Sequence, residues 1–111
     1  MPSLKVPAMH PSIAAKQPEI AELCRRFHVR RLEVFGSAAR GADFDPEHSD
    51  ADFLVELETD SSMSLLDAYL GLQYGLGALL GRPIDLVMPT AISNPFVRAS
   101  IDQTRERIFG A

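Results

Sequence analysis

Three aspartates stand in segments where aspartate is unusual, because the neighbouring residues are apolar and strand-like. Asp50 and Asp52 open the segment 50–57, and Asp85 lies in the middle of the segment 83–88. Aspartate is depleted from strands, and buried charges are rare unless they are paired or bind a metal. Side chains alternate along a strand, so Asp50 and Asp52 point to the same face, about 6–7 Å apart. If the strand at 83–88 pairs with the strand at 50–57, Asp85 joins them on that face.

Three carboxylates this close together repel one another strongly, and a divalent cation removes the conflict. Magnesium prefers oxygen ligands and typically uses one or two carboxylates, with water and substrate phosphates completing its shell. Two such ions about 3.5–4 Å apart can hold the attacking and leaving oxygens of an in-line phosphoryl displacement. We therefore predict that Asp50, Asp52 and Asp85 are the metal ligands and catalytic residues of a site for two Mg²⁺ ions.

A second group of residues could hold phosphates. Gly36 and Ser37 directly follow the strand-like segment 31–35 and stand at the start of a possible helical turn. Glycine lets the backbone come close to a phosphate, and a serine hydroxyl with the N–H groups of a helix start can bind one. Arg40, on the same turn, can neutralise phosphate charge. Gly36, Ser37 and Arg40 are therefore the predicted nucleotide-binding residues.

Each of these motifs is common by itself, so the alternative that they serve only the fold stays open. The prediction of chemistry depends on their order along the chain. A strand is followed by the glycine–serine pair, a turn with an arginine, a loop, an Asp-x-Asp pair that opens a second strand, and an aspartate in the third strand.

The elements that position these residues are predicted from apolar spacing and capping residues. Helices are expected over 18–28, over 64–80, and after Asn94, which can cap a helix with Pro95 at its first position. Strands are expected over 31–35, 50–57 and 83–88, with a short edge strand near 107–109. The predicted fold is therefore α/β, a small mixed sheet of three to five strands with helices packed on it.

The glycines of the segment 64–80 allow two interpretations. Gly71, Gly75 and Gly77 cost helix stability, and they could admit either a neighbouring helix or the sheet at close range. Cys24 follows Leu23 on the apolar face of the first predicted helix and is expected in the core.

The bulk composition narrows the classes of function. With 111 residues, the chain is expected to form one domain over 18–111, preceded by a flexible N-terminal arm at 1–17 that contains three prolines. The net charge of −4 argues against direct nucleic-acid binding. A single cysteine excludes an internal disulfide, and no apolar run approaches the ~20 residues that span a bilayer. We expect a cytoplasmic protein that does not enter membranes.

The ordered motifs resemble those of the DNA polymerase β-like nucleotidyltransferase superfamily, and within it those of the minimal nucleotidyltransferase (MNT) group. The matching stretches are 34–41, 49–55 and 84–87, and the segment 94–109 resembles the end of these proteins. The resemblance implies a polymerase β palm-like fold, with ATP as substrate. It also implies that Gly36 and Ser37 hold the phosphates, that three aspartates bind the metal, and that Asp85 is the base for the incoming hydroxyl. The connection between Ser37 and Asp50 is longer than is usual in the family.

Members of the MNT group are commonly paired with a HEPN-domain toxin, for which they act as antitoxin. The resemblance therefore implies an adenylyltransferase that transfers AMP from ATP to a tyrosine hydroxyl of a HEPN toxin, in a hetero-oligomeric complex. The alternative is a non-catalytic module of the same fold that neutralises its partner by direct binding. A transferase for small hydroxylated molecules is a more distant hypothesis, because such enzymes carry an additional domain for the acceptor.

Overall fold

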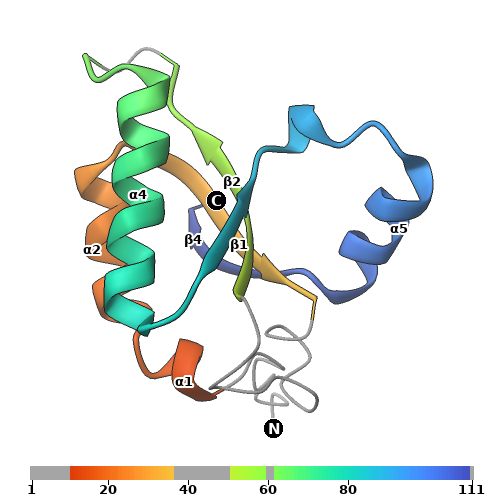
Figure 1. The fold of residues 1–111 in the computed structure, drawn as a ribbon, viewed down its shortest axis with the longest axis horizontal. Coiled ribbons are helices and arrows are strands. Elements are labelled where there is room, and N and C mark those ends of the chain that lie inside the picture. Colours follow the sequence, from red (N-terminus) through yellow and green to blue (C-terminus); the bar gives the residue numbers. More distant parts are fainter. Residues whose placement is uncertain (1–10, 37–50, 60–61, 111) are drawn as a thin grey trace, which may run out of the picture.

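The described residues fold into a four-stranded mixed sheet (Figure 1). This computed structural model describes residues 11–36, 51–59 and 62–110. The strands are β1 (Val29–Phe35), β2 (Ala51–Leu57), β3 (Ile84–Val87) and β4 (Glu106–Gly110), in the order β3-β2-β1-β4. β1 pairs antiparallel with both β2 and β4, whereas β2 and β3 are parallel. The predicted mixed sheet is confirmed.

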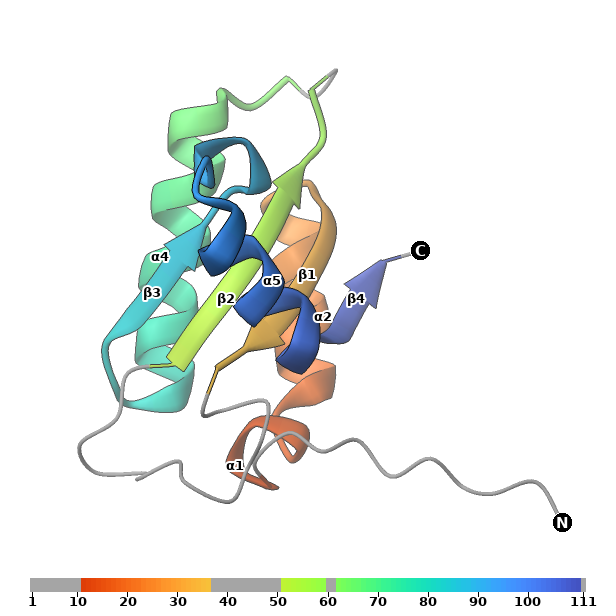
Figure 2. The same ribbon diagram turned by 90° about the vertical axis from the view of Figure 1, so that its right-hand side faces the viewer.

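Helices lie on both sides of this sheet. They are α1 (Pro11–Ala14), α2 (Gln17–Arg26), α4 (Leu65–Leu80) and α5 (Pro95–Thr104), with a short 3-10 helix η1 at Pro89–Ala91. α2 and α4 pack side by side on one face, and α4 forms the connection between the parallel strands β2 and β3. α5 stands over the opposite face (Figure 2). None of the described helices is long and apolar enough to cross a membrane.

Helices α4 and α5 begin at residues with clear capping geometry, and α4 also ends at one. The Ser64 hydroxyl accepts a hydrogen bond from the Asp67 N–H at 3.1 Å, and α4 ends at Gly81 in the left-handed conformation with φ 66°. α5 begins after Asn94, whose side-chain oxygen accepts from the Phe96 N–H at 2.9 Å. Local side-chain chemistry therefore sets these helix ends.

The core lies between the sheet and the α2–α4 layer. It is made of apolar side chains that alternate along the strands and follow one face of each helix. Fully buried members include Ile20, Cys24, Leu32, Val34, Phe53, Val55, Leu72 and Leu76. Burial raises the pKa of the Cys24 thiol to about 12, which agrees with the core position predicted for this cysteine.

The glycines of α4 permit its close packing on α2. A Cβ added at Gly71 would meet the ring of Phe27, and one added at Gly75 would lie 2.9 Å from Leu23. Gly77 instead faces the Arg82 carbonyl oxygen, where a Cβ would find an ordinary 3.5 Å contact. Of the two interpretations of these glycines, the structure therefore selects the neighbouring helix for Gly71 and Gly75.

The N-terminal segment differs in part from the expectation. The predicted flexible arm extends to residue 17, whereas Pro11–Ala14 form helix α1 and the side chain of Ile13 is fully buried in the core. A single apolar residue such as Ile13 gives no helical period, so the sequence did not predict this helix. The burial of its side chain nevertheless attaches the segment to the domain. Residues 1–10 lie outside the described residues.

Candidate active site

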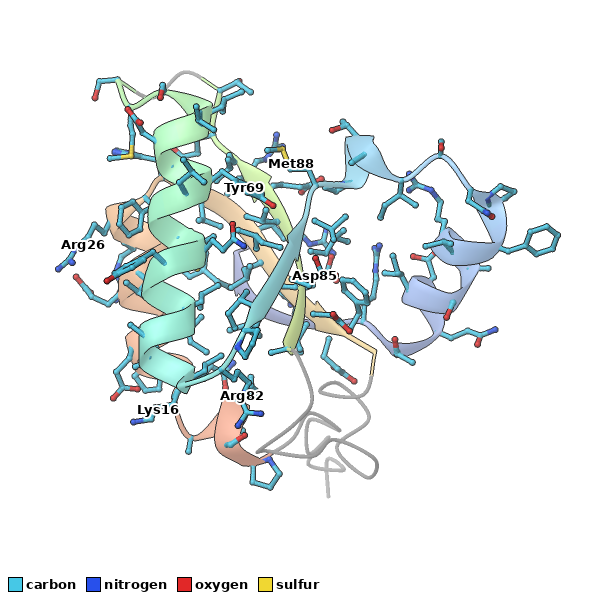
Figure 3. All side chains as sticks on the ribbon, in the orientation of Figure 1. Lys16, Arg26, Tyr69, Arg82, Asp85 and Met88 are labelled. Atoms are coloured by element: carbon cyan, nitrogen blue, oxygen red, sulfur yellow. The ribbon has the colours of Figure 1, made fainter. Side chains whose placement is uncertain are left out.

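Two of the three predicted metal ligands lie side by side on neighbouring strands. Asp52 of β2 and Asp85 of β3 are direct partners in the parallel register. Neighbouring strands lie about 4.8 Å apart, so the two carboxylates can approach one ion. Ala51 and Phe53, on either side of Asp52, are buried in the core. Both aspartates therefore face away from the core, toward the side where α5 stands, as Figure 3 shows for Asp85.

Helix α4 fixes the edge strand that carries Asp85. The Tyr69 hydroxyl donates a hydrogen bond to the Leu86 carbonyl oxygen, and the Gln73 amide donates to that of Ile84 at 3.4 Å. These carbonyls belong to the residues on either side of Asp85. The strand is thus held from the α4 side while the Asp85 carboxylate stays exposed on the opposite face.

Gly36 directly follows the last residue of β1 and lies beside Asp52. Its φ is 70°, a conformation that favours glycine, and its N–H donates to Thr104 Oγ1 at 3.0 Å. A Cβ at this position would lie 2.8 Å from Asp52 Oδ2. The predicted phosphate-binding glycine and the predicted metal ligand are therefore in direct contact, which brings the two sequence motifs into one site.

A cavity of about 440 Å³ opens between this site and α5, and we call it the α5 cavity. It is lined by Phe35, Gly36, Asp52, Val97, Ser100, Ile101 and Thr104. Sequence reasoning missed the four lining residues from α5. Asn94 and Pro95 predict where this helix starts, but no local signal tells which face of the sheet the helix covers. A second cavity of about 350 Å³, lined by Arg30, Glu56 and Met88 among others, contains neither aspartate.

One more carboxylate lies on the same face of the sheet. Glu33 of β1 is only 6% exposed, and its two oxygens lie 3.4 Å from Arg31 Nε and 3.4 Å from Arg105 Nε. Sequence reasoning did not single out this residue. Because it is paired with two arginines and does not line the α5 cavity, we assign it to the attachment of the C-terminal segment, not to catalysis.

The sequence from residue 19 to residue 108 matches the family model of the nucleotidyltransferase domain. The chain belongs to this family. MJ1379 of Methanocaldococcus jannaschii, provisionally named a protein adenylyltransferase, is 34% identical over 93 residues, covering 77% of this chain and 90% of the relative. The protein adenylyltransferase MntA of Thermococcus cleftensis is 41% identical over 73 residues, covering 66% of this chain and 69% of that protein.

Solved structures agree with this family. A structure provisionally named a minimal nucleotidyltransferase matches with a TM-score of 0.68 and 32% identity, covering 86% of this chain and 91% of the other. A chain from the complex of the tri-AMPylated Shewanella oneidensis HEPN toxin with MNT antitoxin matches with a TM-score of 0.59, covering 88% and 72% of the two chains. At 19% identity, this second likeness shows the fold alone. The predicted family, fold and enzyme class are confirmed.

The described part of this nucleotidyltransferase offers a donor set that fits magnesium. Among the described residues there is no group of three or more His, Cys, Asp and Glu side chains that could hold a metal. Asp52 and Asp85 supply two carboxylates, and Mg²⁺ typically takes one or two from a protein and completes its shell with water and phosphate oxygens. Asp50, Ser37 and Arg40 lie outside the described residues, so their roles stay predictions.

Proposed function

We propose that this nucleotidyltransferase is a Mg²⁺-dependent protein adenylyltransferase that modifies a tyrosine hydroxyl of a HEPN-domain toxin and thereby acts as its antitoxin. The observation that carries the proposal is the register pairing of Asp52 with Asp85 on the face that borders the α5 cavity. The names of the relatives support protein adenylylation, and the AMPylated toxin in the S. oneidensis complex supports a HEPN acceptor. We propose a cytoplasmic location for the pair.

The residues divide the work of the reaction. Asp52 and Asp85, together with Asp50, would hold the magnesium, which when bound neutralises phosphate charge and orients the α-phosphate of ATP. Ser37 and Arg40 would hold the β- and γ-phosphates through a hydroxyl and a guanidinium, and Gly36, whose N–H is donated to Thr104, would let the backbone come close to them. The direct contact between Gly36 and Asp52 supports a common site for phosphate and metal.

The transfer itself is an in-line displacement. The oxygen of the acceptor tyrosine forms a bond to the α-phosphorus of ATP, and the bond from that phosphorus to the β-phosphate bridging oxygen breaks. AMP remains on the tyrosine, and pyrophosphate leaves. Asp85 would accept the hydroxyl proton, a role that its exposed position beside Asp52 permits.

The test uses the full chain with a HEPN-domain toxin, ATP and MgCl₂, and follows the toxin by intact mass. Asp52→Asn and Asp85→Asn keep the size of the side chain and remove its charge. We expect each to lower the rate of AMP addition by at least about 10²-fold, the scale on which electrostatic catalytic groups act. Asp67→Asn, an exposed aspartate in the first turn of α4, is the matched control and should keep the wild-type rate.

Two results would contradict the proposal. One is the absence of AMP addition by the folded wild-type protein. The other is equal rates for the wild-type protein and Asp85→Asn. If the toxin is neutralised equally well by both aspartate variants, the protein acts by direct binding instead, as a non-catalytic module.

A further inference from the structure

Helix α5 forms one wall of the α5 cavity, yet little of it touches the sheet. Residues 93–100 are all exposed, and Ile101 is the one buried residue of the helix. Phe96, at the N-terminal end, is 84% exposed. Figure 1 shows α5 standing apart from the sheet, joined to β4 at its C-terminal end. Arg98 donates hydrogen bonds to the carbonyl oxygens of Pro89 and Ile92 in the segment before the helix, so the contacts that join α5 to the sheet lie near its C-terminal end.

Besides the buried Ile101, two consecutive residues make polar contacts there. Thr104 Oγ1 accepts the hydrogen bond from the Gly36 N–H, and it lies 3.4 Å from the carbonyl oxygens of both Ser100 and Ile101. Because the hydroxyl proton points to these helix carbonyls, a lone pair of Oγ1 is left to face Gly36. Arg105 forms ion pairs with Glu33 on β1 and with Asp102 at 3.0 Å.

Gly36, which Thr104 holds in place, lies in turn against Asp52, the carboxylate that is proposed to bind the metal. Its Cα lies against Asp52, since a Cβ would come within 2.8 Å of Oδ2. We infer that Thr104 is a positioning residue of the active site. Its hydroxyl holds the Gly36 turn against Asp52. The same hydrogen bond fixes how far the α5 wall of the cavity stands from this turn, and so the space that is left for the nucleotide. The inference rests on the proposed function, in which Asp52 binds Mg²⁺ and Gly36 contacts phosphate.

The test compares nucleotide affinity among variants at one position. Thr104→Val keeps the shape of the side chain and removes the hydroxyl, whereas Thr104→Ser keeps the hydroxyl. Ile20→Val, which removes one buried methylene on the far side of the sheet, is a control for loss of stability alone. Binding of AMP-PNP with Mg²⁺ is measured by calorimetry on the full chain, well below the melting temperature of each variant.

We expect Thr104→Val to weaken AMP-PNP binding at least about fivefold, the scale of one hydrogen bond, because the Gly36 turn is then no longer held in its binding geometry. Thr104→Ser and Ile20→Val should stay within about twofold of the wild-type protein. Unchanged affinity in Thr104→Val would overturn the inference. So would a serine variant as weak as the valine variant, or an equal loss in Ile20→Val.

Failure of the proposed function gives a different pattern. If the wild-type protein binds AMP-PNP but adds no AMP to the toxin, the proposed reaction is wrong, and the affinities of the Thr104 variants still decide the positioning role. If the wild-type protein binds no AMP-PNP in the presence of Mg²⁺, both are overturned.

Discussion

At the scale of single residues, the site depends on how closely Gly36 approaches Asp52. Gly36 follows the last residue of β1 in the left-handed conformation, and this turn places its backbone against a carboxylate of the neighbouring strand. A larger residue at this position would destabilise the protein in two ways, by straining the backbone and by displacing the Asp52 carboxylate. The glycine therefore serves both the fold and the proposed metal site.

Gly36→Ala and Gly81→Ala separate these two effects. Gly81 has a similar φ of 66°, but a Cβ there would meet nothing within 4 Å. We expect Gly81→Ala to lower the free energy of unfolding by about 1 kcal/mol through backbone strain alone. Gly36→Ala should lose more and should also weaken Mg²⁺–AMP-PNP binding. Urea unfolding and calorimetry measure both effects, and equal losses with unchanged nucleotide binding would show that the Asp52 contact is unimportant.

At the scale of elements, the edge strand β3 and helix α5 are positioned in different ways. β3 is held by its ladder with β2 and by hydrogen bonds from Tyr69 and Gln73 of α4. α4 is in turn seated on α2 through Gly71 and Gly75. The strand that carries Asp85 is therefore supported by the packed layer of α2 and α4. α5 is joined to the sheet by a few contacts near its C-terminal end.

The packing of α4 on α2 predicts opposite effects for two glycine substitutions in one helix. In Gly71→Ala the new methyl group collides with the ring of Phe27, and overpacking of this kind costs about 1–3 kcal/mol. In Gly77→Ala the methyl group meets only a 3.5 Å contact, so the better helix propensity of alanine should stabilise the protein by about 0.5–1 kcal/mol. Thermal or urea unfolding checks the signs. A stabilising Gly71→Ala would mean that α2 and α4 pack less closely than described.

At the scale of the whole molecule, the site joins segments from nearly the full length of the domain. Gly36 follows β1, Asp52 lies in β2, Asp85 in β3 and Thr104 at the end of α5. A ligand that contacts these segments together binds the folded chain and not the unfolded one. Ligand binding should therefore raise the stability of the entire domain.

Mg²⁺ and nucleotide are expected to stabilise the protein jointly. At about a hundred times its Kd, AMP-PNP with Mg²⁺ should add about 2.7 kcal/mol to the free energy of unfolding and raise Tm by several degrees. EDTA should remove this gain without unfolding the protein, since the core consists of packed apolar side chains. Asp85→Asn should show little gain. A full shift in the presence of EDTA would exclude a magnesium-dependent site.

The amino-acid sequence by itself determined the local features of this protein. The caps at Ser64, Gly81 and Asn94, and the position of Asp52 within an otherwise apolar strand, follow from neighbouring residues, so they could be predicted. The tertiary structure decided that β3 lies beside β2 in a register that pairs Asp52 with Asp85. It also decided that Thr104 reaches Gly36 across 68 residues of chain. Such contacts arise when distant segments pack together, and no pattern within either segment encodes its partner.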